Sequence, residues 1–316
     1  MKRIVIGTRG SKLALWQAEW VANQLKALVP DIEVELQKIK TTGDKILDVP
    51  LAKIGGKGLF VKEIEEALLR EDVDIAVHSM KDVPTVLPEG LGIVAICKRE
   101  TPSDAFVSRL GPDGSPLYAN LKALPQGATV GTSSLRRICQ IRYLRHDLNL
   151  VPLRGNLDTR LRKLDEGQFD AIILAEAGMK RLGVASRITD VLSPEMVLPA
   201  IGQGAIGIEA KLSREDVVSL IKRLDHQETR ICVEAERAFL ERLEGGCQVP
   251  IACYARRVDG LIQIDALVGD LEGRRLVRGQ KRTSPEMATN EAVSLAEELL
   301  QRGAREILEE VYGSQR

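Results

Sequence analysis

The chain has 316 residues, which is enough for two to three domains of ordinary size. Its 45 lysines and arginines balance its 45 aspartates and glutamates, which argues against a uniformly basic nucleic-acid-binding protein and against an acidic disordered tail. Hydrophobic residues make up 44% and aromatic residues only 3%, so we expect a globular protein whose ligand contacts are polar or charged rather than stacked rings.

The apolar run near the amino terminus ends at Gly7 and is shorter than the ~7–15 apolar residues of a secretory signal. No later segment approaches the ~18 apolar residues of a membrane span. The five cysteines are an odd number without paired spacing, which argues against an extracellular disulfide framework. We therefore expect a soluble, cytoplasmic protein that does not bind membranes.

The first hundred residues alternate strands with helices. Short apolar or alternating runs predict strands at Arg3–Ile6, Glu33–Ile39 and Asp74–Val77. Ser11 is suited to cap a helix whose apolar residues recur every three or four positions. A second helix follows the glycine-rich segment 54–58. This alternation predicts a mostly parallel sheet with helices on both faces.

A second α/β pattern of similar size begins near Thr101, and it does not repeat the sequence of the first. Its expected strands and helices are 129–131, 134–145, 148–153, 157–164 and 169–175. After residue 222 the pattern changes to a long helix, three consecutive strands and a further helix, at 228–243, 251–256, 261–268, 274–279 and from 284. This order predicts a small α+β domain at the carboxyl end.

Positive charge is concentrated in residues 131–163, which contain seven arginines and one lysine against two aspartates, a local net charge of +6. Arg136 and Arg137 fall in the first turn of a predicted helix, and Arg154 follows the next strand, where open α/β sheets bind ligands. The excess of arginine favours recognition of carboxylates or phosphates. A solvated helix face is the alternative interpretation. Nucleic-acid binding is disfavoured because Tyr143 is the single aromatic residue of the segment.

The motif Gly202–Gly207 matches G-x-G-x-x-G, but a strand rather than a helix is expected after it. A tight crossing between domains is therefore the better interpretation than a dinucleotide site. The three histidines are scattered and no cysteine or histidine pair has zinc spacing, so we expect no metal.

Cys247 differs from the other cysteines because it follows two glycines in a loop directly after a helix. Such a thiol is accessible, and it is either a nucleophile or attachment point or an incidental thiol. Cys97, Cys139 and Cys232 lie in apolar or helical runs and are expected in the core, whereas Cys253 lies in a strand.

Asp82 lies in the polar turn His78–Asp82 at a strand's end, beside Lys81. A turn aspartate at the surface is the simpler interpretation. The functional one is a single carboxylate that stabilises a cation developing on an otherwise anionic substrate.

Seven segments, in order along the whole chain, resemble the porphobilinogen deaminase (hydroxymethylbilane synthase) family. They are Ile6–Ala14, Gly55–Phe60, His78–Pro84, Gly131–Arg137, Leu153–Asn156, Gly202–Ala205 and Glu244–Pro250. The chain departs from the family pattern at Glu176, where a small residue is usual, at Ile201, where proline is frequent, and at Cys253.

The resemblance implies two α/β domains like those of type II periplasmic binding proteins, with a cleft between them, and a small carboxyl-terminal α+β domain. The implied divisions are 1–99 with 199–222 for domain 1, 100–198 for domain 2, and 223–316 for the cofactor-carrying domain. The implied activity joins four porphobilinogen molecules head to tail, releases four ammonia, and uses a covalently bound dipyrromethane primer. The expected protein is a monomer whose one partner is this small substrate.

The resemblance also assigns roles to individual residues. Asp82 matches the catalytic carboxylate, and Cys247 matches the cysteine that carries the dipyrromethane through a thioether. Cofactor-binding positions are matched by Lys81, Ser134, Arg136, Arg137, Arg160 and Arg181. Substrate-binding positions are matched by Arg9, Ser11 and Arg154. Whether the loop around Lys57 closes over the site is left open.

Overall fold

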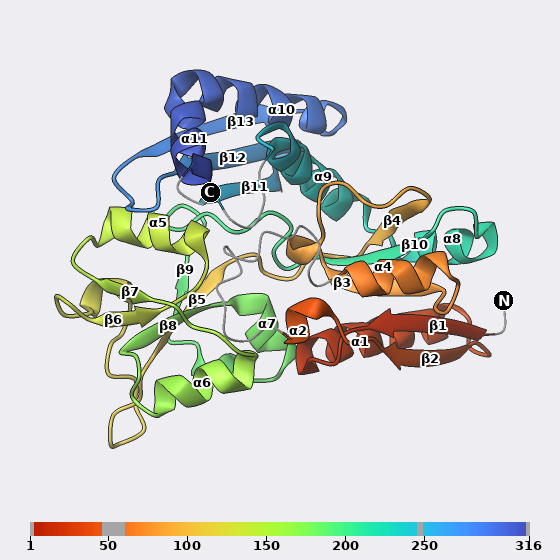
Figure 1. Ribbon diagram of the computed structural model, residues 1–316, viewed down its shortest axis with the longest axis horizontal. Coiled ribbons are helices and arrows are strands. Elements are labelled where there is room, and N and C mark those ends of the chain that lie inside the picture. The colour runs from red at the N-terminus through yellow and green to blue at the C-terminus, as the bar shows by residue number, and fades with distance from the viewer. Residues whose placement is uncertain (1–2, 46–60, 245–248, 314–316) are drawn as a thin grey trace. The chain divides into compact units, whose positions relative to one another are not determined.

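The computed structural model describes residues 3–45, 61–244 and 249–313, and its chain contacts separate two compact units (Figure 1). The described residues 3–45, 61–100 and 204–231 form the first unit, and 101–203 with 232–244 and 249–313 form the second. The glycine-rich segment 54–58, the loop around Lys57 and Cys247 lie outside the described residues.

The first unit is built on a five-stranded sheet with the order β2-β1-β3-β10-β4. The strands are β1 (Arg3–Thr8), β2 (Glu33–Lys38), β3 (Ile75–Ser79), β4 (Leu91–Ile96) and β10 (Ile206–Lys211). Strand β1 pairs in parallel with β2 and β3, whereas β10 runs antiparallel between β3 and β4. The expected sheet is therefore mostly parallel, with one antiparallel strand contributed by a distant segment.

Helices cover both faces of this sheet, as its apolar strands require. They are α1 (Lys12–Leu28), α4 (Lys62–Leu69) and α8 (Glu215–Ile221), with the short helix α2 (Thr42–Lys45) after β2. Helix α1 begins after Ser11, whose Oγ accepts a hydrogen bond from the Ala14 amide over 3.3 Å. One apolar cluster joins α1 and α8 to the sheet, and another joins α4 to the opposite face.

The second unit contains a five-stranded sheet with the corresponding order, β7-β6-β8-β5-β9. The strands are β5 (Asp104–Ser108), β6 (Thr129–Gly131), β7 (Asn149–Val151), β8 (Ala171–Ala175) and β9 (Asp190–Leu192). Here β5 is the antiparallel strand, between β8 and β9. Helices α5 (Leu135–Leu144), α6 (Leu157–Asp165) and α7 (Glu176–Arg181) each follow one of the parallel strands.

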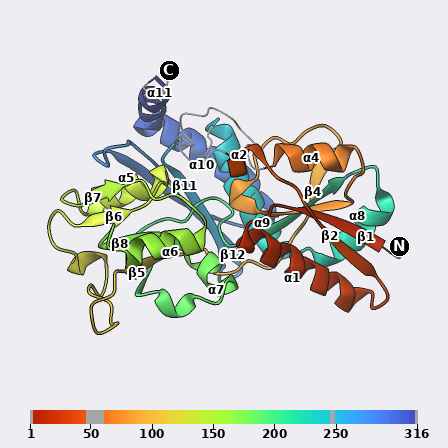
Figure 2. The same cartoon turned by 60° about the horizontal axis from the view of Figure 1, so that its bottom comes forward.

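A three-stranded antiparallel sheet completes the second unit. It consists of β11 (Ile251–Val258), β12 (Leu261–Gly269) and β13 (Leu276–Thr283), and α10 (Ala288–Leu299) packs along β12 and β13 (Figures 1 and 2). Helix α11 (Arg305–Gly313) follows, and the long helix α9 (Gln227–Arg242) precedes the sheet. The buried carboxylate of Glu236 on α9 accepts hydrogen bonds from the amides of Gly202 and Ala255, which fixes the segment before β10.

The fold class is the one expected: two α/β parts and a small α+β part at the carboxyl end. The cleft between the α/β parts and the three-domain boundaries stay predictions. One detail of the sequence interpretation was wrong: His78 belongs to β3 and is buried rather than part of a polar turn. The pattern also did not predict β4, β5, β9 or the helices α7, α8 and α11. No helix among residues 3–45, 61–244 and 249–313 has the length and hydropathy of a membrane span.

Candidate active site

A pocket of about 60 Å³ in the first unit lies at the carboxyl ends of β1 and β3 and the amino end of α1. It brings together three residues predicted for the site, since Asp82 lines the same pocket as Arg9 and Ser11, about seventy positions earlier in the sequence. Its other lining residues are Leu13, Ala14, Gln17, Val61, Val77, His78 and Ser79. The sheet edge thus assembles a cation, a hydroxyl and a carboxylate in one concavity.

Asp82 is held by the short 3₁₀ helix Met80–Asp82 that directly follows β3. The flanking residues Met80 and Val83 are buried, at 1% and 6% exposure, so they anchor the turn while Asp82 stays exposed. The carboxylate of Asp82 has no hydrogen-bond or ion-pair partner within the described part of the chain. It is therefore available to a ligand in the pocket.

The polar residues Gln17, His78 and Ser79 also line this pocket, and the sequence did not indicate them as site residues. Gln17 is 2% exposed and its Nε2 donates a hydrogen bond to Ser79 Oγ over 2.8 Å. Beside it, His78 on β3 is bound to Glu209 of β10. One signal was visible: Gln17 falls on the apolar face of a helix, where a polar residue must find a partner.

In the second unit, Arg136 and Arg137 at the start of α5 converge on the fully buried Asp104 of β5. Nη1 and Nη2 of Arg136 donate to the two Asp104 oxygens over 2.6 and 3.2 Å, and Nη2 of Arg137 donates over 2.7 Å. The side chain of Gln203 donates to the same carboxylate over 2.9 Å. Burial alone would raise the pKa of Asp104, but the two guanidiniums outweigh it and hold that pKa below its ordinary value.

The three buried residues Asp104, Arg136 and Arg137 carry a net charge of +1, since one carboxylate neutralises one of two guanidiniums. The surplus cation lies at the amino end of α5, where free backbone amides also favour an anion. Ser134 is the residue that precedes α5, although its side chain makes no capping hydrogen bond to the described chain. The two arginines thus contribute charge to this end of the helix from a buried position.

The remaining predicted arginines lie at other helix and strand ends of the second unit. Arg160 on α6 donates through Nε to the Gly155 carbonyl over 2.8 Å. Arg154 is half-buried, and its guanidinium has no hydrogen-bond partner among the described residues. Arg181 ends α7 and is half-buried. Arg154 is thus the clearest cation left for an anionic ligand in this unit.

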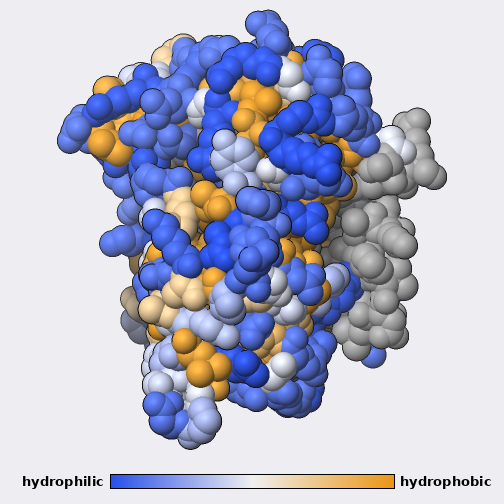
Figure 3. Space-filling view, turned by 90° about the vertical axis from the view of Figure 1, so that its left-hand side faces the viewer, coloured by the Kyte–Doolittle hydropathy of each residue, from blue (hydrophilic) through white to orange (hydrophobic). Residues whose placement is uncertain are grey.

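The arginine-rich segment is not a uniform basic face. Arg142 donates to the Leu271 carbonyl, Arg145 pairs with Asp147, and Arg162 pairs with Glu166. The face seen from the side of β6, β7 and α5 is largely hydrophilic, with small separate hydrophobic patches (Figure 3). The segment is therefore partly a solvated surface, as at the exposed pair Arg162–Glu166, and partly buried, as at Arg136 and Arg137.

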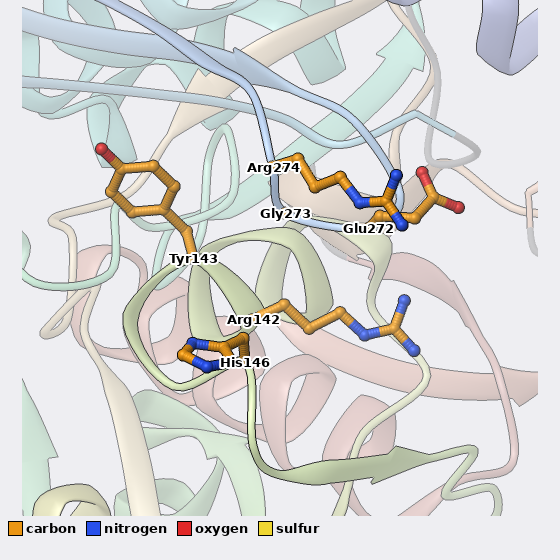
Figure 4. A pocket seen from close by; sticks show the side chains of 6 residues that line it. All are labelled: Arg142, Tyr143, His146, Glu272, Gly273 and Arg274. Carbon is orange, nitrogen blue, oxygen red and sulfur yellow. The ribbon is translucent and has the colours of Figure 1, made fainter.

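A larger pocket of about 620 Å³ in the second unit contains none of the predicted site residues. It lies between the end of α5 and the turn before β13, and Arg142 and Arg274 extend along it in the same direction while Tyr143 points away (Figure 4). The turn packs closely: a side chain at Gly273 would approach the Cys139 carbonyl to 2.6 Å. This region joins the three-stranded sheet to α5.

The four cysteines that the structure describes are all buried, and this was expected for Cys97, Cys139 and Cys232. They are Cys97, Cys139, Cys232 and Cys253, each at most 5% exposed. Burial raises the pKa of the Cys139 thiol to about 12, so it is not a nucleophile at neutral pH. Cys247 is the remaining candidate for covalent attachment, although it lies outside the described residues.

Several solved structures of periplasmic binding domains are similar to the chain at low identity. The VFT2 domain of Bordetella pertussis BvgS is 15% identical over 71% of this chain and 86% of that chain, with a TM-score of 0.41. The methionine binding protein MetQ is 15% identical over 70% and 89%, with a TM-score of 0.43. An arginine-specific periplasmic binding protein of Salmonella typhimurium is 12% identical over 71% and 92%, with a TM-score of 0.39. These similarities are too distant to indicate a ligand.

Two family models match almost the whole described chain. The model of the porphobilinogen deaminase dipyrromethane cofactor binding domain matches residues 4–219, and that of the porphobilinogen deaminase carboxyl-terminal domain matches residues 230–301. The chain therefore belongs to the porphobilinogen deaminase family, whose members condense porphobilinogen into hydroxymethylbilane with a dipyrromethane cofactor.

Proposed function

We propose that this chain is a hydroxymethylbilane synthase, in which Asp82 is the catalytic carboxylate and Cys247 carries the dipyrromethane through a thioether. It joins four porphobilinogen molecules head to tail and releases four ammonia. The observation that carries the assignment of the site is the pocket shared by Arg9, Ser11 and Asp82. We also propose that it acts as a monomer in the cytoplasm, with porphobilinogen as its small-molecule substrate.

The side chains present suit a dipyrromethane, which carries four carboxylates and two pyrrole N–H groups. Arginines that end helices or follow strands provide the matching cations, and Arg154 has no competing partner in the described chain. We assign cofactor binding to Lys81, Ser134, Arg136, Arg137, Arg160 and Arg181, and substrate binding to Arg9, Ser11 and Arg154. When bound, the cofactor supplies the unsubstituted pyrrole carbon to which the first substrate is joined.

Asp82 stabilises positive charge on the substrate. Loss of ammonia from the aminomethyl group leaves a cation conjugated with the pyrrole N–H. An ionised carboxylate that accepts a hydrogen bond from that N–H stabilises the cation by charge and by position. Asp82 suits this role because no described side chain neutralises it and two buried neighbours fix its turn. Arg9 and Ser11 in the same pocket would orient the acetate and propionate arms.

Intact mass with peptide mapping of the freshly purified protein tests the attachment. We expect an adduct of two linked pyrroles on the peptide that contains Cys247, absent in Cys247→Ser. Cys253→Ser is the matched control, because Cys253 is fully buried in β11 and should leave the adduct in place. An unmodified Cys247 in active protein would overturn the assignment.

Substitution of Asp82 by asparagine tests the catalytic role. The exposed turn tolerates this near-isosteric change, so the circular dichroism spectrum should be unchanged while kcat falls by about 10²–10³. Asp72→Asn, at an exposed aspartate of the same unit, should leave kcat unchanged. Near-normal turnover in Asp82→Asn would remove Asp82 from the catalytic role.

A further inference from the structure

His78 lines the pocket that contains Asp82 and is bonded to Glu209, and a third titratable side chain, Glu65, interacts electrostatically with both. We call them the His78 cluster: His78 on β3, Glu209 on β10 and Glu65 on α4. His78 itself lines the pocket, and its side chain is only 4% exposed. The role assigned to Asp82 uses none of the three.

The strand register explains how the cluster forms. In the antiparallel pair, Gly207 lies opposite His78 and Glu209 lies opposite Ala76, so the side chains of His78 and Glu209 share the face covered by α4. The His78 Nε2 is 2.9 Å from Glu209 Oε2, and Glu209 is fully buried. The absence of a side chain at Gly207 leaves room for Met80 to pack there, in the turn that holds Asp82.

Glu65 belongs to helix α4, which covers the face of the sheet that carries His78 and Glu209. It is 7% exposed on the buried face of α4, and burial followed by the charge of Glu209 raises the pKa of Glu65 to about 7, while His78 opposes this rise. Oε1 of Glu65 and Oε1 of Glu209 are both buried without a hydrogen-bond partner in the described residues. The cluster therefore has spare acceptor sites for a proton.

Other charged groups on the elements packed against α4 are occupied elsewhere. Strand β4 has no charged residue, Arg3 on β1 pairs with Glu35, and Lys211 on β10 pairs with Glu71. On α4 itself, Glu63 accepts a hydrogen bond from Thr42. The remaining charged residues of α4 are Lys62 and Glu66, both exposed. Among the charged residues of α4 and the strands packed against it that the structure describes, the charge inside the cluster is thus set by its own three members, with Asp82 and Arg9 in the pocket.

The reaction of the family needs protons to be given and recovered. Each condensation breaks one C–N bond and one C–H bond and forms one C–C bond. The C–N electron pair leaves with the nitrogen, and a neutral aminomethyl group must gain one proton to depart as ammonia. One proton is released from the attacked ring carbon. Each added ring therefore takes one proton from the site and returns one.

We propose that the His78 cluster holds this exchangeable proton: His78 gives it when ammonia departs and recovers it after carbon–carbon bond formation, while Glu209 and Glu65 keep it in the cluster. This inference rests on the proposed function. It assigns no proton transfer to Asp82, whose carboxylate stabilises the cation. His78 is thus the proton-exchanging group, and Glu209 and Glu65 are positioning residues.

The pH dependence of kcat for the dipyrromethane-loaded enzyme tests the proposal. Glu65→Gln removes one of the two carboxylates that help the cluster to keep its proton. The alkaline limb of the pH profile of kcat should therefore move to lower pH by about half a unit to one unit, with KM unchanged. Glu66→Gln is the matched control, because Glu66 is the exposed neighbour on the same helix. His78→Gln should lower kcat by about 100-fold across the pH range.

An alkaline limb that stays in place in Glu65→Gln would overturn the proposal and leave the cluster a purely structural one. Because Glu65→Gln keeps the shape of the side chain, this outcome is decisive even if His78→Gln fails to fold. Wild-type protein without hydroxymethylbilane production or without the Cys247 adduct would instead refute the proposed function. The two failures are therefore distinguishable in one set of measurements.

Discussion

The two five-stranded sheets have the same strand order but bury different charged groups. In both, the antiparallel strand contributes a fully buried carboxylate, Glu209 on β10 and Asp104 on β5. Asp104 is paired with two guanidiniums, whereas Glu209 is paired with an imidazole and lies near the second carboxylate Glu65. The same framework therefore holds a permanently charged group in one unit and a titratable one in the other.

The difference follows from the chemistry of the partners. Arginine keeps its proton at any physiological pH, so the cluster of Asp104, Arg136 and Arg137 has a constant charge of +1. The buried Glu65 exchanges its proton near neutrality, because burial and the charge of Glu209 raise its pKa to about 7. A constant positive charge suits the retention of polycarboxylates, and a titratable group suits proton transfer during the reaction.

The largest effect is expected from Asp104→Asn. It leaves two buried guanidiniums without a counter-charge, which should lower the free energy of unfolding by about 3–5 kcal/mol in urea denaturation. The lowered pKa of Asp104 means that its contribution is present above the ordinary aspartate range and is lost only in strong acid. The loss should therefore be equal at pH 5 and pH 8.

Asp165→Asn provides the control for that measurement, because Asp165 forms an exposed pair with Arg187 in the same unit. It should cost less than about 1 kcal/mol. If Asp104→Asn lowered the free energy of unfolding as little as the control does, the ion pairs of Asp104 with Arg136 and Arg137 would not stabilise the fold.

A smaller, pH-dependent effect is expected from Glu65→Gln. Because the pKa of Glu65 is raised from 4.5 to about 7, its contribution to stability is full below pH 4.5 and is lost as pH rises through 7. The wild-type protein should thus lose up to about 3 kcal/mol between pH 5 and pH 8 that the variant does not lose. Equal pH slopes for wild type, Glu65→Gln and Glu66→Gln in urea unfolding would contradict the titratable character of the cluster.

The smallest effect compares the two serines that precede the first helix of each sheet. Ser11 caps α1 through its side chain, whereas Ser134 precedes α5 without a capping hydrogen bond to the described chain. Ser11→Ala should lower the free energy of unfolding by about 1 kcal/mol, and Ser134→Ala should lower it by a few tenths of a kcal/mol. Equal losses, measured by thermal unfolding, would mean that the two helix starts are held in the same way.

Local patterns of apolar and polar residues predicted much of the architecture. Helix α1 and strand β1 follow from apolar spacing, and the three consecutive strands near the carboxyl end follow from alternation bounded by turns. The burial of Cys97, Cys139 and Cys232 was predicted correctly for the same reason. Strands β5 and β9 were not predicted, since a short buried strand has no distinctive period.

The site was predicted only in part. The resemblance to the family indicated Asp82, Arg9 and Ser11, and these three line one pocket. Sequence reasoning assigned Arg136 and Arg137 to the binding of carboxylates, but it did not indicate that Asp104, more than thirty positions earlier, binds both. It also gave no role to Gln17, and it placed His78 in a turn.

By itself the sequence determined the balance of charge, the concentration of arginine between residues 131 and 163, and a motif set that identifies the family. Only the tertiary structure decided which of those charges stay available and which are neutralised. The reason is that β10 joins its sheet from a distant segment and β5 pairs with β8 and β9 rather than with the next strand along the chain, and each brings a carboxylate into an interior where a charge must find a partner. Whether that partner can release a proton depends on which strand or helix lies beside it, and local sequence does not encode this.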